Sequence, residues 1–203
     1  VIKSYKEPIE TLSTNIMGTV NLLEICKSIE SIKAIINVTS DKCYENNNTK
    51  KQYVEGDRLG GSDPYSASKA CAEIIHSSYR QSFYSKGKKG LSSVRAGNVL
   101  GGGDFSENRL IPDIIRSAIN KDKLLIRNPN STRPWQHVFD VINGYMILGK
   151  KLYDKPQALS GPYNFSPNVE NCITVEKILY KINKLLKTNY EIIPSEFYEA
   201  NLL

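Results

Sequence analysis

The sequence has no CxxC pair and only two histidines, and this scarcity excludes most metal-binding and disulfide-stabilised architectures. Its four cysteines stand at positions 26, 43, 71 and 172, too far apart for a zinc ribbon. Such spacing favours free thiols in a reducing compartment, and we expect a cytoplasmic protein. A site of three histidines is impossible, and no spacing supports a mixed cysteine–histidine site. We therefore expect no bound metal ion.

Long hydrophobic runs are also missing. No uninterrupted apolar stretch approaches the roughly 20 residues that span a bilayer, and no charged-then-apolar leader follows Val1. Hydrophobic residues make up 40% and charged residues 24% of the chain, which is ordinary globular usage and excludes collagen-like, disordered and coiled-coil classes. We expect a soluble globular protein with no membrane partner.

The net charge of +6 does not by itself identify a partner, because nucleic acid, anionic membranes and phosphorylated small molecules all attract basic proteins. The densest basic run, residues 86–89, falls where a helix is expected to end, and the helix dipole favours cations there. The other basic residues are mixed with acidic ones and form no stripe with aromatic residues. We therefore expect no nucleic-acid partner.

Helical and strand-like segments alternate along the chain. Apolar spacing predicts helices over residues 11–28, 65–86, 109–120, 138–152 and 174–187, and short apolar runs predict strands at 33–39, 91–96, 124–127, 163–165 and 190–193. The first helix is expected to begin at Thr11 or Ser13, and Gly87 is expected to close the second. Such alternation is typical of βαβ units, so we predict an α/β fold with a doubly wound parallel sheet and helices on both faces.

The connection at residues 40–64 is long for a compact domain, so it is either a functional lid or a segment with an unrecognised element. Because the two most informative motifs flank it, we favour the lid. The chain also looks incomplete. Residues 1–8 hold no predicted strand and residues 200–203 end without a helix cap. Few strands are predicted for such a sheet, and we expect a fragment of a larger protein.

The most informative motif is Tyr65-Ser-Ala-Ser-Lys69, because the i to i+4 spacing places a phenol and an ammonium on one helix face. A cation near a phenol lowers its pKa, so that Tyr65 can serve as a general base near neutral pH. Alone, this pattern more often marks an exposed tyrosine beside an exposed lysine. Asp63-Pro64 predicts a helix start directly before it, which puts Tyr65 in the first turn and favours the functional interpretation.

Ser40-Asp41-Lys42 follows a predicted buried strand, at the sheet edge where open α/β folds bind ligands. Taken by itself, this cluster is more often a turn whose side chains bond to the backbone. With the tyrosine–lysine motif on the next helix, the functional interpretation is favoured. Two other residues near these motifs are given no catalytic role: His76 is expected to be structural and Cys43 to be unreactive.

Two more segments combine flexible backbone with groups that bind anions. Residues 95–104 follow another predicted strand and are rich in glycine, yet neither GxGxxG nor GxxGxxG occurs anywhere in the chain, so no dinucleotide phosphate loop is expected here. A flexible loop explains that composition equally well. In the segment Arg133-Pro-Trp-Gln-His137, the arginine can grip a diphosphate and the indole can pack under a sugar or base. A core tryptophan beside a surface arginine is the alternative.

Taken together, these motifs resemble the extended short-chain dehydrogenase/reductase family, and within it the nucleotide-sugar 4,6-dehydratases that act on CDP-glucose. The motifs that carry the resemblance are Asn15-Ile-Met-Gly18-Thr19, Ser40-Asp41-Lys42, Tyr65-Ser-Ala-Ser-Lys69, Arg95-Ala-Gly-Asn98 and Arg133-Pro-Trp-Gln-His-Val138. The resemblance implies a bound NAD, a nucleotide-diphosphate sugar substrate and a homodimer through helices near residues 12–28 and 65–86. It also implies that residues 1–100 form the second half of a Rossmann-like dinucleotide-binding domain. Residues 101–203 would be mostly substrate-binding, with elements that return to the Rossmann sheet.

The resemblance also implies a role for each catalytic residue. Tyr65 would take the proton of the sugar 4-hydroxyl, and Ser40 would hydrogen-bond that hydroxyl. Lys69 would hold the nicotinamide ribose and Thr39 would lie beside the cofactor. Asp41 would protonate the departing 6-hydroxyl.

Further roles follow from the same resemblance. Asn15 would support a proton relay, and Asn98, Arg109 and Arg133 would hold the nucleotide diphosphate. Lys42 stands where related dTDP-glucose enzymes have a glutamate that takes the C5 proton, which leaves the C5 base open.

Other functions remain open on the sequence alone. An epimerase or reductase of the same superfamily would share Tyr65 and Lys69 but would not need Asp41. A non-catalytic remnant that acts as a dimerisation module is a third possibility. Because the family's glycine-rich loop is absent from this sequence, we expect the isolated chain to bind NAD weakly and to be inactive.

Overall fold

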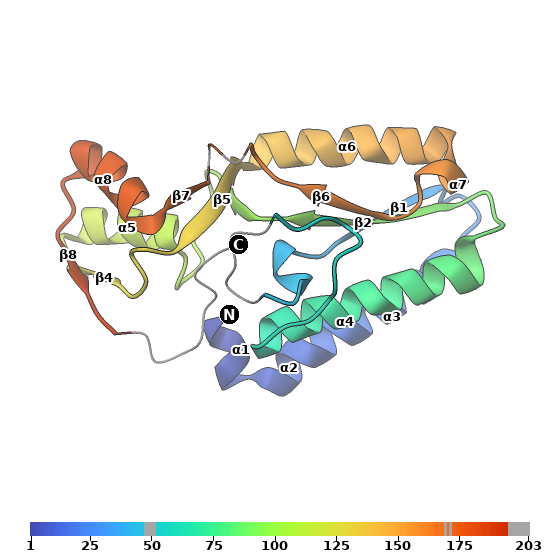
Figure 1. Cartoon of the computed structure of the whole chain (residues 1–203), viewed down its shortest axis with the longest axis horizontal. Coiled ribbons are helices and arrows are strands. Elements are labelled where there is room, and N and C mark those ends of the chain that lie inside the picture. The colour runs from blue at the N-terminus through green and yellow to red at the C-terminus, as the bar shows by residue number, and fades with distance from the viewer. Residues whose placement is uncertain (47–51, 169, 171, 195–203) are drawn as a thin grey trace.

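The computed structural model describes residues 1–46, 52–168, 170 and 172–194. Figure 1 shows an elongated molecule with two parts: a parallel sheet between layers of helices, and a smaller part made of short strands and two helices. The N-terminus lies near the junction of the two parts. The expectation that the chain ends without a cap concerns residues outside the described ranges. Within the described ranges, no helix is both long enough and apolar enough to cross a membrane.

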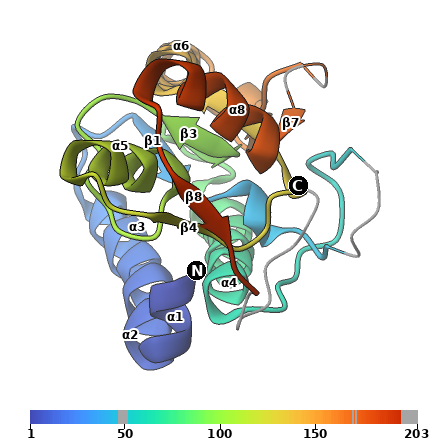
Figure 2. The same cartoon turned by 90° about the vertical axis from the view of Figure 1, so that its left-hand side faces the viewer.

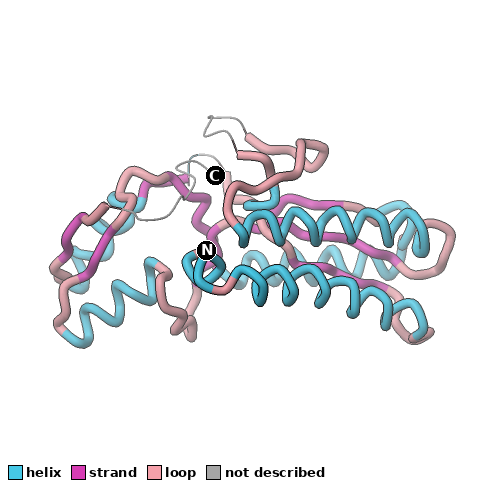
Figure 3. The backbone as a smooth tube through the Cα atoms, turned by 90° about the horizontal axis from the view of Figure 1, so that it is seen from below, coloured by secondary structure: helices cyan, strands magenta, loops and turns pink. Residues whose placement is uncertain are grey.

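The larger part is built on three parallel strands in the order β1-β2-β6. They are β1 (Ala34–Val38), β2 (Gly90–Ala96) and β6 (Pro162–Phe165). Helix α6 (Val138–Asp154) covers one face, and α3 (Gly18–Ser28) and α4 (Pro64–Tyr79) cover the other (Figures 1 and 3). Because both faces are covered, residues 90–95 of the middle strand are all buried, without polar alternation. The predicted parallel sheet with helices on both faces is confirmed.

The N-terminal helical segment begins earlier than predicted. Residues 2–28 contain four successive helical elements: α1 (Ile2–Lys6), α2 (Pro8–Leu12), the π-helical turn η1 (Ser13–Met17) and α3. Thr11 and Ser13 are not N-caps, since Pro8 already occupies the first turn, where its missing N–H costs nothing. The Thr11 hydroxyl instead donates to the Glu7 carbonyl at 3.0 Å.

Helix α4 begins as predicted and ends sooner. Asp63 caps it by accepting hydrogen bonds from the backbone N–H groups of Tyr65 and Ser66, each at 3.0 Å. The helix ends at Tyr79 and continues as the π-helical turn η3 (Arg80–Tyr84), so Gly87 does not close it.

The smaller part holds two small sheets; the sequence predicted the strands near residues 124–127 and 190–193, but not the three strands of the other sheet. A three-stranded sheet has the order β3-β5-β7, with β3 (Asn98–Leu100) parallel and β7 (Cys172–Thr174) antiparallel to β5 (Thr132–His137). A parallel pair, β4 (Leu124–Ile126) and β8 (Tyr190–Ile192), lies against α5 (Leu110–Asn120) and α8 (Val175–Leu186) (Figure 2). Ile114, Leu124, Ile126 and Leu179 form their common core.

The long connection between β1 and α4 contains structure of its own. It starts with the 3₁₀ turn η2 (Asp41–Cys43), and an antiparallel bridge joins Tyr44 to Leu59. Cys43 and Tyr44 pack on Ala70 of α4, so this segment is anchored to the helix. A further short helix, α7 (Pro156–Leu159), joins α6 to β6.

Candidate active site

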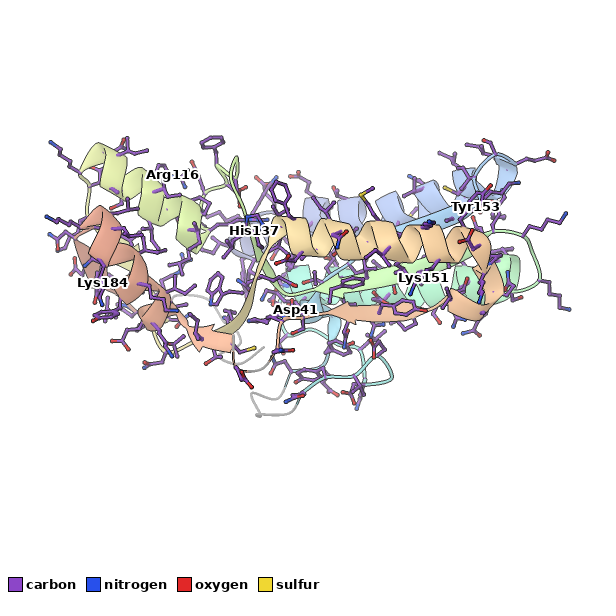
Figure 4. All side chains as sticks on the ribbon, turned by 90° about the horizontal axis from the view of Figure 1, so that it is seen from above. Asp41, Arg116, His137, Lys151, Tyr153 and Lys184 are labelled. Atoms are coloured by element: carbon purple, nitrogen blue, oxygen red, sulfur yellow. The ribbon has the colours of Figure 1, made fainter. Side chains whose placement is uncertain are left out.

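A cavity of about 700 Å³ lies at the carboxyl edge of the parallel sheet, where residues of both parts of the molecule line it. Figure 4 shows Asp41 in this central region, close to the start of α6, where His137 is labelled. The predicted site residues that line the cavity are Thr39, Ser40, Asp41, Lys42, Tyr65, Asn98, Arg109 and Arg133. Lys69 and Asn15 are not among its lining residues.

The turn after β1 presents Ser40 and Asp41 to this cavity. Ser40 has an extended backbone, and its Oγ accepts from the Lys42 N–H at 3.2 Å and donates to Asp41 Oδ1 at 3.0 Å. Asp41 Oδ2 is buried and has no hydrogen-bond partner among the described residues. Because a buried carboxylate oxygen without a partner is costly, its position in the cavity wall points to a ligand hydroxyl as the missing partner.

Tyr65 lies in the first turn of α4, half-buried, beside the Ser40 turn. Burial raises the pKa of its phenol above the ordinary value; the side-chain hydrogen bond with Ser40 lowers it, and the nearby Asp41 carboxylate raises it further. The Lys69 ammonium lies 6.0 Å from the centre of the Tyr65 ring. The expected lowering of the Tyr65 pKa is therefore wrong for this structure, because loss of solvent outweighs the hydrogen bond with Ser40 and the attraction of Arg109.

Lys69 itself is half-buried one turn further along α4. Burial lowers the pKa of its ammonium, and the Glu73 carboxylate one turn later raises it in part. Lys69 is therefore a cation flanked by two residues of the same helix face, Tyr65 and Glu73.

Asn15 reaches the catalytic helix through a serine that the sequence analysis overlooked. Its side-chain nitrogen donates to Ser68 Oγ at 2.9 Å, and the Ser68 hydroxyl donates to the Tyr65 carbonyl at 2.7 Å. Asn15 lies in the π-helical turn η1, and its own carbonyl accepts from Thr19 Oγ1 at 2.7 Å. The available signal was a small hydroxyl residue inside the tyrosine–lysine motif.

A buried ion pair lies directly behind the site and was also missed. Arg95 Nη2 is 2.6 Å from Glu73 Oε2, with the two side chains only 4% and 2% exposed. The Thr39 hydroxyl donates to the other carboxylate oxygen of Glu73, so it is engaged inside the protein. The signal for Glu73 was its i+4 spacing from Lys69, and nothing in the sequence indicated that Arg95 is its partner.

The residues expected to hold a diphosphate differ in their surroundings. Arg133 is buried, and its Nη1 donates to the Thr132 carbonyl at 2.9 Å, so the alternative of a surface arginine is wrong. Arg109 precedes α5 with its side chain 63% exposed, 3.2 Å from Asp104 Oδ2. Trp135 lines the cavity, and its indole N–H donates to the Ile173 carbonyl at 3.1 Å.

Two titratable residues near the site are unsuited to catalysis. Burial raises the pKa of the Cys43 thiol to about 12 and lowers the pKa of His76 to about 4. Both groups are therefore uncharged near neutral pH, as expected for an unreactive thiol and a structural histidine. In the described part of the chain, no cluster of three or more metal-ligating side chains is found.

Comparison with known proteins assigns the family. The model of the family described as GDP-mannose 4,6 dehydratase matches residues 1–188. This chain belongs to that family. It is 50% identical to CDP-glucose 4,6-dehydratase of Salmonella typhimurium over 184 residues, 88% of this chain and 51% of that enzyme. It is 33% identical to dTDP-D-glucose 4,6-dehydratase of Dictyostelium discoideum over 162 residues, 74% of this chain and 36% of that enzyme. The chain thus spans about half the length of the Salmonella enzyme and about a third of the length of the Dictyostelium enzyme.

Solved structures of dehydratases have the same fold as this chain. The dTDP-glucose 4,6-dehydratase DesIV of Streptomyces venezuelae, with NAD bound, superposes with a TM-score of 0.85 at 17% identity and covers 100% of this chain and 60% of that one. The dTDP-glucose 4,6-dehydratase of Bacillus anthracis, in complex with NAD, superposes with a TM-score of 0.77 at 26% identity. The match covers 97% of this chain and 60% of that one. The fold is therefore the Rossmann-type α/β fold of these dehydratases, as predicted.

Proposed function

We propose that this chain carries the catalytic residues of an NAD-dependent nucleotide-sugar 4,6-dehydratase, with CDP-glucose as the substrate. The observation that carries the proposal is the convergence of Ser40, Asp41 and Tyr65 on one cavity, with the buried Asp41 Oδ2 lacking a partner among the described residues. Dehydration of a sugar needs an acid and a base on the same substrate, and Asp41 and Tyr65 supply them. The 50% identity to the Salmonella enzyme supports CDP-glucose as the sugar nucleotide.

Each side chain has a defined task in this proposal. Tyr65 removes the proton of the sugar 4-hydroxyl, and the Ser40 hydroxyl holds that oxygen. Asp41 gives a proton to the 6-hydroxyl as it leaves as water, and Lys42 takes the C5 proton. When bound, NAD would supply the acceptor for the hydride from C4 and the donor for its return to C6. Because burial holds the proton on Tyr65, we expect the rate to rise with pH across the neutral range.

The cavity fits the nicotinamide end of NAD better than its diphosphate. Tyr65 and Thr39 line the cavity and Lys69 lies 6.0 Å from the Tyr65 ring, which suits the nicotinamide ribose. The sequence holds no GxxGxxG loop, so these residues alone do not provide the cradle for the cofactor diphosphate. We propose that Asn98, Arg109 and Arg133 hold the diphosphate of the substrate instead. In domain terms, residues 1–100 belong to the dinucleotide-binding part, and residues 101–203 mostly bind substrate, with α6 and β6 returning to the parallel sheet.

The proposal includes a homodimer and a cytoplasmic location. Leu22, Ile25 and Ile74 on α3 and α4 are each more than half exposed, although they are large and apolar. A second copy of the same helices would cover them. The free cysteines of the described chain suit a reducing compartment.

The test is a chimera in which this chain replaces the matching segment of the Salmonella enzyme. We expect the chimera to convert CDP-glucose with the loss of one water. Mass spectrometry of the product measures this loss. Tyr65→Phe, Asp41→Asn and Lys42→Ala should each abolish the loss of water while NAD remains bound. A folded chimera that binds NAD and leaves CDP-glucose intact would refute the proposal. An Asp41→Asn chimera that still interconverts the configuration at C4 would indicate an epimerase.

A further inference from the structure

The Glu73–Arg95 pair joins helix α4, strand β2 and the end of strand β1 behind the site. Glu73 comes from α4 and Arg95 from the middle strand β2, and the 2.6 Å contact between them is almost fully buried. Both carboxylate oxygens of Glu73 are engaged: Thr39 donates to Oε1, and Ser93 Oγ donates to Oε2 at 2.9 Å. Although burial raises the pKa of Glu73, the hydrogen bond and attraction of Arg95, together with the hydrogen bonds from Thr39 and Ser93, outweigh burial and hold that pKa below its ordinary value. The pair is therefore ionised.

The same pair holds the catalytic turn at both of its ends. Thr39, bonded to Glu73, immediately precedes Ser40 and Asp41. Tyr44 immediately follows the turn η2, and Arg95 Nη1 donates to its hydroxyl at 2.7 Å. The turn that carries Asp41 therefore lies between Thr39 and Tyr44, which are both hydrogen-bonded to the Glu73–Arg95 ion pair.

A second set of contacts connects the ion pair with the long connection between β1 and α4 and with strand β6. The Tyr44 hydroxyl donates to Asn164 Oδ1 at 2.6 Å, and the Tyr44 ring stacks on Tyr53 at 4.9 Å. Arg95 Nη1 also donates to the Glu55 carbonyl at 3.1 Å, and Glu55 Oε1 accepts from the Asn164 N–H at 2.8 Å. Displacement of Tyr44 would therefore disturb the loop and the strand together.

On helix α4, Glu73 lies on the same helix face as Tyr65, the proposed catalytic base. Tyr65, Lys69 and Glu73 follow one another at intervals of four residues, so they share one face of the helix. Glu73 therefore connects the helix that carries Tyr65 with the turn that carries Asp41.

Stability alone does not account for such a pair, because removing two charges from water offsets most of their attraction, and an apolar replacement of both is often as stable. We propose that Glu73 and Arg95 are positioning residues that set Asp41 and Ser40 against Tyr65. The catalytic consequence rests on the proposed dehydratase function, whereas the ordering of the turn does not.

The decisive variant is the double substitution Glu73→Gln and Arg95→Met, which removes both charges and leaves neither buried alone. Its matched control is Glu45→Gln with Arg58→Met, the same changes at an exposed ion pair in the neighbouring loop, where the two atoms are 3.2 Å apart. Tyr44→Phe is a milder variant, because it keeps the stacked ring and removes only the hydroxyl that Arg95 holds.

Two measurements apply to each variant. Hydrogen–deuterium exchange in the chain itself reports on the amides of Lys42 and Cys43, which bond to Ser40 Oγ and to the Ser40 carbonyl. Turnover of CDP-glucose in the chimera separates kcat from KM. A role limited to folding would change neither the exchange nor kcat of a folded variant.

We expect the double variant to fold, its turn amides to exchange about tenfold faster, and kcat to fall about 10- to 100-fold with KM nearly unchanged. The control pair should match the wild type. Unchanged exchange and kcat in the folded double variant would overturn the proposal. If the double variant does not fold, Tyr44→Phe decides by the same two measurements. If wild-type turnover is absent, the dehydratase function fails, and the exchange comparison still decides whether the pair orders the turn.

Discussion

His76 lies on helix α4 behind the site with 1% exposure, and neither ring nitrogen has a hydrogen-bond partner among the described residues. Burial lowers its pKa to about 4; Glu73 opposes that shift, while Arg80 and Arg95 reinforce it. The imidazole therefore stays neutral in the folded protein at pH values where it is charged in the unfolded chain.

This difference predicts how stability depends on pH. The pKa of about 4 in the folded state lies below the unfolded value near 6.5, so the unfolded chain binds the proton first. The contribution is complete above pH 6.5 and is lost as the pH falls towards 4, by up to about 3 kcal/mol. Urea unfolding at pH 7 and pH 4.5 measures the loss, and His76→Leu should remove this part of it.

The other histidine provides the control for that measurement. His137 is exposed at the start of α6 (Figure 4), and His137→Gln should keep the pH dependence of the wild type. Equal losses in the wild type and in His76→Leu would contradict the prediction.

Among the site residues, the sequence could place Ser40, Asp41 and Tyr65 together because two local signals are strong. A buried β-branched strand ends just before Ser40, and Asp63-Pro64 starts a helix just before Tyr65. The protonation of Tyr65 and the Glu73–Arg95 pair could not be predicted. Both depend on how deeply α4 is buried against β2, which is a property of tertiary packing.

At the scale of elements, Gly61 fixes the connection from β1 against the first turns of α4. A Cβ atom at this position would lie 2.3 Å from the Ala67 nitrogen and 2.4 Å from the Ser66 carbonyl carbon. These are backbone atoms of the helix that carries Tyr65, so they cannot move without displacing it. Only glycine allows this approach.

The close approach gives a prediction with a control in the same loop. Gly61→Ala should lower the free energy of unfolding by about 1–3 kcal/mol, because an extra methyl in a packed site forces backbone shifts. Gly56→Ala, where no atom lies within 4 Å of the added Cβ, should change it by less than about 0.5 kcal/mol. Urea unfolding of both variants provides the measurement. Equal stability of the two would show that the loop adapts.

The elements that the sequence could predict are those with a helical period or a run of apolar residues. Helices α4, α5, α6 and α8 and strands β1, β2 and β4 are of this kind, and short runs also predicted β6 and β8. Strands β3 and β7 have three residues each, one of them polar, and were not predicted. Strand β5 contains Pro134, which cannot donate to a ladder and so argues against a strand in the sequence.

At the scale of the whole molecule, the outer face of α3 and α4 predicts self-association. Ile25 is 56% exposed on this face, and Ile142 is 45% exposed on α6, on the opposite side of the sheet (Figure 1). We expect the wild type to sediment as a dimer and Ile25→Lys to sediment as a monomer, because a buried unpaired lysine is costly. Ile142→Lys, the same change on the other layer, should remain dimeric. A monomeric wild type, or a dimeric Ile25→Lys variant, would contradict the proposed interface.

The parallel sheet also determines the order in which the chain can complete its fold. Strand β2 pairs through Gly90 with Ala34 and through Ser93 with Pro162, so both of its partners are remote in the sequence. Such pairs form slowly, because long segments must be closed before any contact is gained. During synthesis, β2 therefore keeps one unpaired edge until the residues of β6 have left the ribosome. During that interval the unpaired edge of β2 exposes the nascent chain to misassociation.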